Sequence, residues 1–151
     1  MQETIKQEGL IYIEPGIKFD DLADNFELFD DWEDRYRYII DLGRKLPPFP
    51  ESAMTDTFKV RGCMSQVWMV PGHKPEKKDC FVFAADSDAH IVKGLIYILA
   101  TLYSGKTATE IASIKAEDAF ARLGLDQHLS PSRRNGFVSM VERIHAVADT
   151  A

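Results

Sequence analysis

The sequence has few features of a membrane protein, an exported protein or a nucleic-acid-binding protein. No apolar run reaches the roughly 20 residues that a membrane-spanning helix needs. The first residues mix acids, glycine and proline with short apolar pairs, and they lack the basic-then-apolar order of a signal peptide. The formal net charge of -6 would repel phosphate backbones, and basic residues gather only at Lys74, Lys77, Lys78 and the pair Arg133, Arg134. We therefore expect a cytoplasmic protein that has neither a membrane nor nucleic acid as a partner.

Cysteine is scarce, and the common sequence motifs of cofactor sites are missing. Cys63 and Cys80 are the two cysteines, and without an export signal we expect reduced thiols rather than a disulfide. The sequence has no GxxxxGK[ST] phosphate loop, no GxGxxG after a strand, no GxSxG elbow and no HExxH pair. A metal ion could draw on Cys63, His73, Cys80 and His90, but none has the short spacing that places two ligands together. We expect neither a metal nor a bound cofactor.

The chain has the size of one domain. Its 151 residues are enough to bury a single core, and 45% hydrophobic with 28% charged residues is the composition of a globular protein. The leading segment differs from the rest, because its apolar residues follow no clear helical or strand period. We expect residues 1–20 to be an N-terminal extension and residues 21–151 to form the domain.

Apolar residues at helical spacing, with capping residues before them, predict most of the helices. A first helix is expected over 20–29. The longer ones are a helix capped by Asp30 or Asp31 and running through Leu46, one capped by Asp86 or Ser87 and ending at Gly105, and one capped by Ser130. A capping box of Thr107 and Glu110 predicts a short helix through Ser113, and 117–123 is expected to form another.

Three segments have the composition of strands. They are 57–61, 66–70 and 80–85, and the last two are joined by the turn-rich PGHKPEKKD. A helix, then short strands, then further helices is the order of an α+β protein. The sequence therefore predicts a small three-stranded antiparallel sheet packed with several helices.

The segment RGCMSQVWMV places Cys63 after a glycine and before a buried strand. Gly62 permits backbone angles that other residues avoid, and Met64-Ser65-Gln66 gives a short break before the apolar run. Such a loop could present the thiol for chemistry. Free cysteine is also among the most buried residue types, so a purely structural role stays open at this point. Cys80, beside Phe81 at a strand start, is interpreted as structural.

Two further features have both a functional and a structural interpretation. Arg133 and Arg134 occupy the first turn of the last helix, where the helix dipole disfavours cations. A guanidinium near Cys63 would favour the thiolate, but plain solvation also explains an arginine on a surface turn. Asp86 and Asp88 suit the start of a helix, and the one that does not cap it could hold the cysteine loop or face a partner.

Taken together, four segments resemble the SufE family of cysteine desulfuration proteins, which are sulfur acceptors for iron-sulfur cluster assembly. They occur in the order and spacing of the family and cover nearly all of residues 21–147. The segments are WEDRYRYIIDLGRKLP, VRGCMSQVWMV, DSDAHIVKGLIYIL and LSPSRRNGFVSMV. The resemblance implies a compact α+β fold like those of SufE and the IscU-type scaffolds.

The resemblance also implies a function and a set of site residues. Cys63 matches the cysteine that takes sulfur from the persulfide of a pyridoxal-phosphate-dependent cysteine desulfurase and passes it to an iron-sulfur cluster scaffold. The pyridoxal phosphate belongs to that partner enzyme. Asp88 matches an aspartate associated with the cysteine loop, and Arg133 matches an arginine near the active cysteine. We expect a monomer when unbound, little turnover without the desulfurase, and a Cys63 that rests partly packed and swings outward on docking.

Two other functions remain open from the residues alone. A thiol enzyme that acts on a small molecule, such as a peroxidase or a thioester hydrolase, could use Cys63 with Arg133 or a histidine. A non-catalytic adaptor would leave both cysteines inert.

Overall fold

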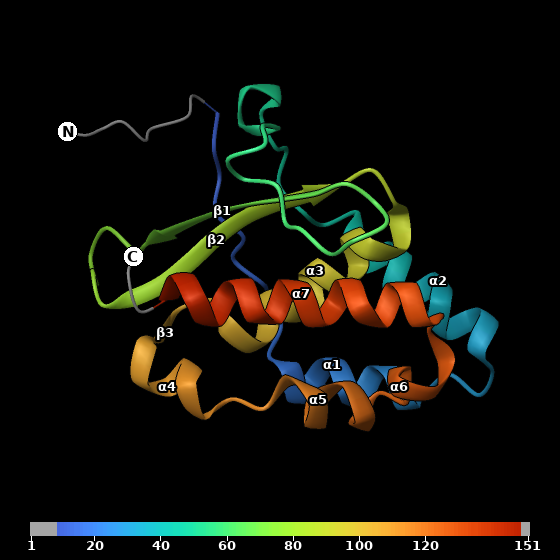
Figure 1. Ribbon diagram of the computed structural model, residues 1–151. Helices are drawn as coiled ribbons and strands as arrows, with labels where there is room; N and C mark the ends of the chain where they lie inside the picture. The colour runs from blue at the N-terminus through green and yellow to red at the C-terminus, as the bar shows by residue number, and fades with distance from the viewer. Residues whose placement is uncertain (1–8, 149–151) are drawn as a thin grey trace.

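The computed structural model describes residues 9–148 and has the expected α+β architecture (Figure 1). A sheet of three antiparallel strands packs against the α-helices. The strands are β1 (Val67–His73), β2 (Cys80–Ser87) and β3 (Lys106–Thr107). The α-helices are α1 (Phe19–Glu27), α2 (Trp32–Gly43), α3 (His90–Tyr103), α4 (Ala108–Ser113), α5 (Ala116–Arg122), α6 (Leu125–His128) and α7 (Pro131–Ala148), with a 3-10 turn, η2 (Glu51–Ala53), before the sheet.

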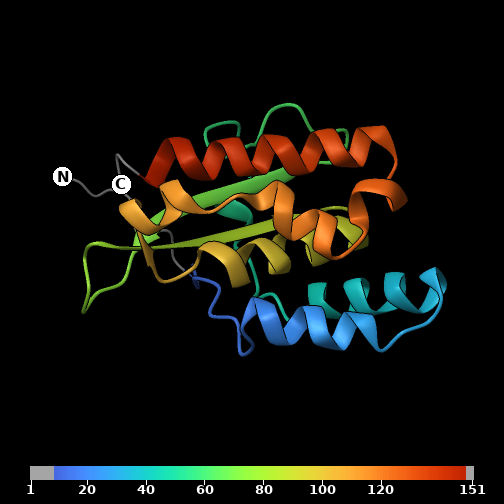
Figure 2. The ribbon, with the colours of Figure 1, turned by 90° about the horizontal axis from the view of Figure 1, so that it is seen from below.

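The helices pack in layers against one face of the sheet. Figures 1 and 2 show α3 and α7 lying side by side on that face, with α4, α5 and α6 beyond them and α1 and α2 behind α3. Alternate strand residues, among them Met69, Phe81 and Phe83, point into this core, and each is at most 1% exposed. Burial of an apolar helix such as α3 on an apolar sheet face is the main source of stability in such a layered domain.

The sheet has the predicted number of strands, but the third strand is a different segment. The prediction of a strand over 57–61 is wrong: this segment makes a single bridge, Lys59 with Trp68. Two backbone hydrogen bonds join it to β1, from the Val60 N–H to the Val67 carbonyl and from the Met69 N–H to the Phe58 carbonyl. The turn at Gly62, with a φ of 90°, lies between this bridge and β1. The third strand is β3, which follows Gly105, where a φ of 79° and a 2.7 Å hydrogen bond to the Phe81 carbonyl turn the chain back onto β2.

Most predicted helix starts are confirmed. Asp31 caps α2 by accepting a hydrogen bond from the Asp34 N–H at 2.9 Å. Thr107 and Glu110 form the expected capping box of α4. The Ser130 hydroxyl accepts from the Arg133 N–H at the start of α7.

The start of α3 and the end of α2 differ from the predictions. Neither Asp86 nor Ser87 is the N-cap of α3; the chain stays extended through Ala89, and the helix begins at His90 without a side-chain cap. Helix α2 ends at Gly43 instead of continuing to Leu46. The short helix α6 was not predicted, because four residues are too few for a periodic pattern.

Residues 9–18, which fall in the expected extension, lie against the sheet. The Ile13 N–H donates to the Phe83 carbonyl at 2.9 Å, and the Ile13 side chain is 1% exposed. The Gly16 N–H donates to the Tyr97 hydroxyl of α3 at 3.2 Å. This segment therefore contributes to the core.

Two glycines allow α2 and α3 to approach closely. A Cβ built on Gly43 would lie 2.7 Å from the backbone nitrogen of Gly94, and one built on Gly94 would overlap the Ile39 carbonyl. Contacts this short with backbone atoms leave no flexible side chain that could move aside. The two helices can hold their present distance only with glycine at both positions.

We therefore expect Gly94→Ala to destabilise the fold. The added methyl would force α2 away from α3, at a cost of about 3 kcal/mol in the free energy of unfolding. Chemical denaturation monitored by circular dichroism measures this difference. Gly16→Ala is the control, since a Cβ there would meet nothing within 4 Å. A Gly94→Ala protein as stable as the control would contradict the glycine contact.

Candidate functional site

The loop between residue 60 and β1 brings Cys63 against helix α7. Gly62 begins the turn with a φ of 90°, a conformation that side chains disfavour. It also lies so near α7 that a Cβ at this position would overlap the Ser139 side chain. Glycine is thus required here both for backbone angle and for space.

The Cys63 side chain is half-buried and touches the backbone of α7. Its Sγ donates a hydrogen bond to the Gly136 carbonyl at 3.6 Å, a bond that only the protonated thiol can make. A Cβ on Gly136 would lie 3.4 Å from this sulfur, at the short end of ordinary van der Waals contact, so the helix and the cysteine are closely packed here. The next residue, Met64, is 84% exposed, and the loop tip is therefore at the surface.

A cavity of about 270 Å³ lies beside the thiol. Its walls come from the cysteine loop, from β1, from α3 and from the first turns of α7, and most of the lining is apolar. The lining residues are Cys63, Met64, Ser65, Val67, Val92, Leu95, Ser130, Ser132, Arg133, Gly136, Phe137 and Met140. The space is larger than one added sulfur atom needs, so the resting site could shelter a persulfide.

Asp88 holds the other end of the cysteine loop. Its Oδ1 accepts a hydrogen bond from the Gln66 N–H at 3.0 Å, and its own N–H donates to the Gln66 carbonyl at 3.3 Å. This pair of bonds fixes the residue at which the loop enters β1. The second aspartate of the DSDA segment thus contacts the loop instead of capping α3.

Arg133 lines the same cavity as Cys63, whereas Arg134 does not. Among residues 9–148, the Arg133 guanidinium makes no hydrogen bond or ion pair, so it is free to meet an incoming anion. The Arg134 guanidinium donates to the Asp126 carbonyl at 3.3 Å and faces the opposite side of α7. The structure therefore places Cys63 and Arg133 at one cavity, and Asp88 on Gln66 of the same loop.

The electrostatics of the resting thiol oppose ionisation. Burial raises the pKa of Cys63 above the ordinary value of a cysteine, because the partly apolar surroundings solvate the thiolate poorly. The expected activation by a nearby guanidinium does not outweigh this effect in the resting position. Cys63 in this position is thus a half-buried thiol whose ionisation is disfavoured.

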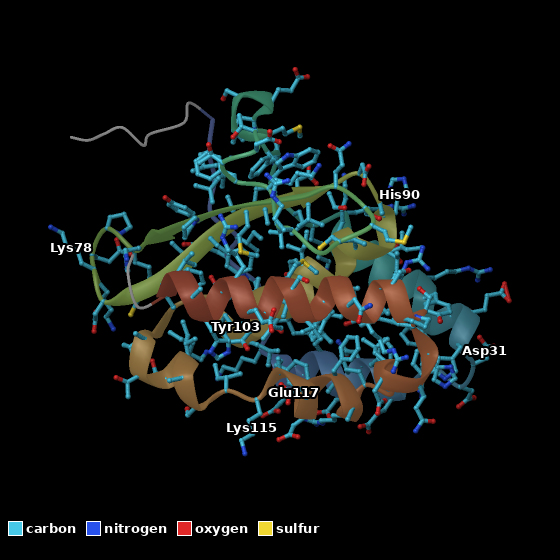
Figure 3. The ribbon with its side chains drawn as sticks, viewed as in Figure 1. Asp31, Lys78, His90, Tyr103, Lys115 and Glu117 are labelled. Atoms are coloured by element: carbon cyan, nitrogen blue, oxygen red, sulfur yellow. The ribbon has the colours of Figure 1, made fainter. Side chains whose placement is uncertain are left out.

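The remaining cysteine and histidine candidates lie elsewhere. Cys80 is 7% exposed at the start of β2, with its sulfur 3.9 Å from the Asp79 carboxylate. Figure 3 shows His90 at the start of α3, outside the cavity lining. Within residues 9–148, no group of three or more His, Cys, Asp or Glu side chains is placed to hold a metal ion.

Two features of the site were missed from the sequence. Gly136 lies inside a helix, where glycine is usually unfavourable, and this mismatch was the available signal for a close contact. The second is the corner before α7: the His128 ring stacks on Trp32 of α2 at a centroid distance of 3.7 Å, and the Tyr36 hydroxyl donates to the His128 carbonyl. These contacts position the chain that leads to Ser130 and Arg133.

Comparison with known proteins places this fold and its cysteine loop in a class connected with iron-sulfur metabolism. Residues 20–148 match the family model of SufE, described as an Fe-S metabolism associated domain. The chain belongs to the SufE family. This match covers Cys63, Asp88 and Arg133.

Individual relatives support the same assignment. An uncharacterized SufE-like protein of Rhizobium meliloti is 47% identical over 131 residues, which cover 86% of this chain and 94% of that protein. A second, from Rhizobium etli, is 48% identical over 85% of this chain and 88% of that protein. The solution structure of a hypothetical protein from Thermus thermophilus has the same fold, with a TM-score of 0.70 and 16% identity over 88% of this chain and 94% of that one.

The structure also bears on the membrane prediction. None of the helices within residues 9–148 combines the length and the hydrophobicity of a membrane span.

The raised pKa of Cys63 predicts a shifted pH profile for alkylation. Iodoacetamide reacts with the thiolate, so the rate for the folded protein should rise through a midpoint above the ordinary thiol range of about 8.5. A Cys80→Ala protein leaves Cys63 as the one reporter, and the same protein unfolded in urea should give the ordinary midpoint. Equal midpoints in the folded and unfolded forms would show that burial does not affect this thiol.

The contact between Asp88 and Gln66 predicts a local change in hydrogen exchange. Asp88→Ala removes the acceptor of the Gln66 N–H, a bond of about 1.5 kcal/mol, so exchange of this amide should accelerate about tenfold. Asp88→Asn retains an oxygen at the same place and should preserve most of the protection. NMR-detected exchange measures both variants, and equal protection in all three proteins would rule out this anchor.

Proposed function

We propose that this protein is a sulfur carrier that accepts persulfide sulfur on Cys63 from a pyridoxal-phosphate-dependent cysteine desulfurase. It stimulates that enzyme and passes the sulfur to an iron-sulfur cluster scaffold. Membership of the SufE family supports the iron-sulfur context. The observation that carries the proposal is Cys63 itself, half-buried beside a cavity on a loop whose tip is exposed.

The transfer is a thiol-persulfide exchange that needs no added oxidant or reductant. As the loop leaves the cavity, the Cys63 thiol gives its proton to solvent. The thiolate attacks the outer sulfur of the persulfide on the desulfurase cysteine, a new S–S bond forms, and the S–S bond of the donor breaks. The donor cysteine leaves as a thiolate. Unloading repeats the exchange, with a thiolate of the scaffold attacking the outer sulfur on Cys63.

The three site residues have separate roles in this scheme. Asp88 anchors Gln66, so motion is confined to the part of the loop before it. Gly62 is the residue with the backbone freedom for that motion. Arg133 lines the cavity, where its positive charge would stabilise the anionic persulfide after loading. The persulfide has a lower pKa than a thiol in general, so it is the species that benefits from a cation in the resting cavity.

The alternative of an independent thiol enzyme has less support. A hydrolase or peroxidase needs a thiolate in the resting state, whereas burial raises the pKa of Cys63. The cavity lining within residues 9–148 also contains no histidine that could serve as a base. The carrier needs a reactive thiolate only once a partner is bound.

Mass spectrometry of Cys63 tests the proposal. After incubation with a cysteine desulfurase and cysteine, we expect the peptide that contains Cys63 to gain the mass of one sulfur atom, and we expect the desulfurase to turn over faster. Cys63→Ser should abolish both effects, because serine cannot hold a sulfane sulfur. Cys80→Ala, which alters the other cysteine, should retain them.

The other functions predict different results. An independent thiol enzyme would lose its own activity in Cys63→Ser but would gain no sulfur from the desulfurase. A non-catalytic adaptor would keep its function in that variant. Absence of the added sulfur on wild-type Cys63 would contradict the carrier function.

A further inference from the structure

A second hollow lies between α5 and α7, on the other side of α7 from the cysteine cavity. Its volume is about 490 Å³. We call it the α5–α7 groove. Its lining residues are Ala116, Glu117, Asp118, Phe120, Ala121, Asp126, Arg134, Phe137, Val138, Val141 and Glu142. The residues divide into an apolar floor and an acidic rim.

The floor of the groove is apolar: its base is formed by the buried Phe120 and Phe137, and its exposed part lies along α7. The rings of Phe120 and Phe137 stack at a centroid distance of 3.9 Å and form its base. Val138 and Val141 extend this surface along α7, and Val138 is 48% exposed. Few large aliphatic side chains among residues 9–148 are this exposed. The described residues leave Val138 half exposed, and a bound partner would remove it from water.

The rim of the groove is strongly acidic. Glu117, Asp118, Asp126 and Glu142 place four carboxylates around the floor. Arg134 is the one basic residue of the lining, and its guanidinium is directed to the Asp126 carbonyl. An anionic ligand or an acidic peptide would be repelled here. An apolar floor within an acidic rim is complementary to an amphipathic segment whose apolar face is flanked by lysine or arginine.

The groove is adjacent to the cysteine site. Phe137 lines both the groove and the Cys63 cavity, so one ring separates the two. Figure 1 shows the cysteine loop along one side of α7 and α5 along the other, and Figure 3 places Glu117 on the α5 side. A protein seated over the first half of α7 would therefore contact the groove and Cys63 together.

We propose that the α5–α7 groove is a docking site for a basic amphipathic helix of the cysteine desulfurase that loads Cys63. This inference rests on the proposed function, because it assumes that such a donor exists. The groove is open while Cys63 is in its resting position, and the resting thiol is the form that the donor meets. The acceptor instead meets the loaded protein.

Docking in the groove has a definite role in loading. A donor that bound only through the mobile cysteine loop would lose its hold as soon as the loop moved. The groove lies on two helices of the rigid core and would keep the donor in place while Cys63 leaves its cavity. It should therefore determine the concentration of donor needed for half-maximal loading and leave the rate at saturation largely unchanged.

Val138→Glu tests the apolar floor. A carboxylate at this exposed position should leave the fold intact but place a charge against the apolar face of the donor helix. We expect the half-saturating concentration of desulfurase for sulfur transfer to Cys63 to rise at least about tenfold. Leu28→Glu is the matched control, since Leu28 is 77% exposed between α1 and α2, away from the groove. It should load like the wild type.

Glu142→Lys tests the acidic rim. Reversing this charge should raise the half-saturating concentration about threefold or more at low salt, and the difference should shrink as ionic strength increases. Glu51→Lys, at an exposed position in η2, is the control with the same change of net charge. Equal loading of all the groove and control variants would overturn the docking site.

Other outcomes separate the possible occupants and the two proposals. If Val138→Glu slowed only the release of sulfur to an acceptor, the assignment to the donor would be wrong. If sedimentation showed a wild-type dimer that Val138→Glu dissociates, a second copy of the chain would be the occupant. If the wild type and the groove variants all load normally, this inference alone is wrong. If the wild type gains no sulfur, the carrier function is wrong.

Discussion

The contact between Cys63 and the backbone of α7 is the constraint on which the site depends. One glycine lies on each side of this contact. In the helix, a Cβ on Gly136 would lie 3.4 Å from the sulfur, which is an ordinary contact distance. In the loop, any side chain at Gly62 would overlap Ser139 and push the loop away from the helix. The thiol would then lose both its hydrogen bond to the helix carbonyl and its partly apolar surroundings. Loop, helix and cavity thus form one unit around a single sulfur atom.

In the carrier that we propose, this arrangement would reconcile two opposing demands on the thiol. Transfer requires a thiolate that another protein can reach, but a permanently exposed thiolate is also open to oxidants. Burial here favours the protonated form of Cys63, although the neighbouring residue Met64 is exposed at the surface. The thiol is therefore protected by its half-buried position, and a small displacement of the loop would expose it.

Local sequence signals predicted most helices and the two main strands, because their apolar periods and caps are short-range. They failed where distant contacts decide the structure. Segment 57–61 has the composition of a strand, yet it pairs with β1 through a single bridge, at Lys59. Asp86 and Ser87 were the expected caps of α3, but both belong to β2 and the helix begins at His90. Cys63 could be singled out as the candidate thiol, whereas its contact with Gly136 and the groove beyond it depend on how α7 packs.

The anchoring of Gln66 has a consequence for how partners take turns. Only two residues, Met64 and Ser65, lie between it and Cys63, and the three residue steps from Cys63 to Gln66 span at most about 10 Å. Any movement of the Cys63 sulfur would therefore be short. In a carrier of the proposed kind, the desulfurase and the scaffold would have to bind at the same place around Cys63, one after the other. One partner would have to dissociate before the next could bind, so the lifetime of each complex would limit the rate of sulfur transfer.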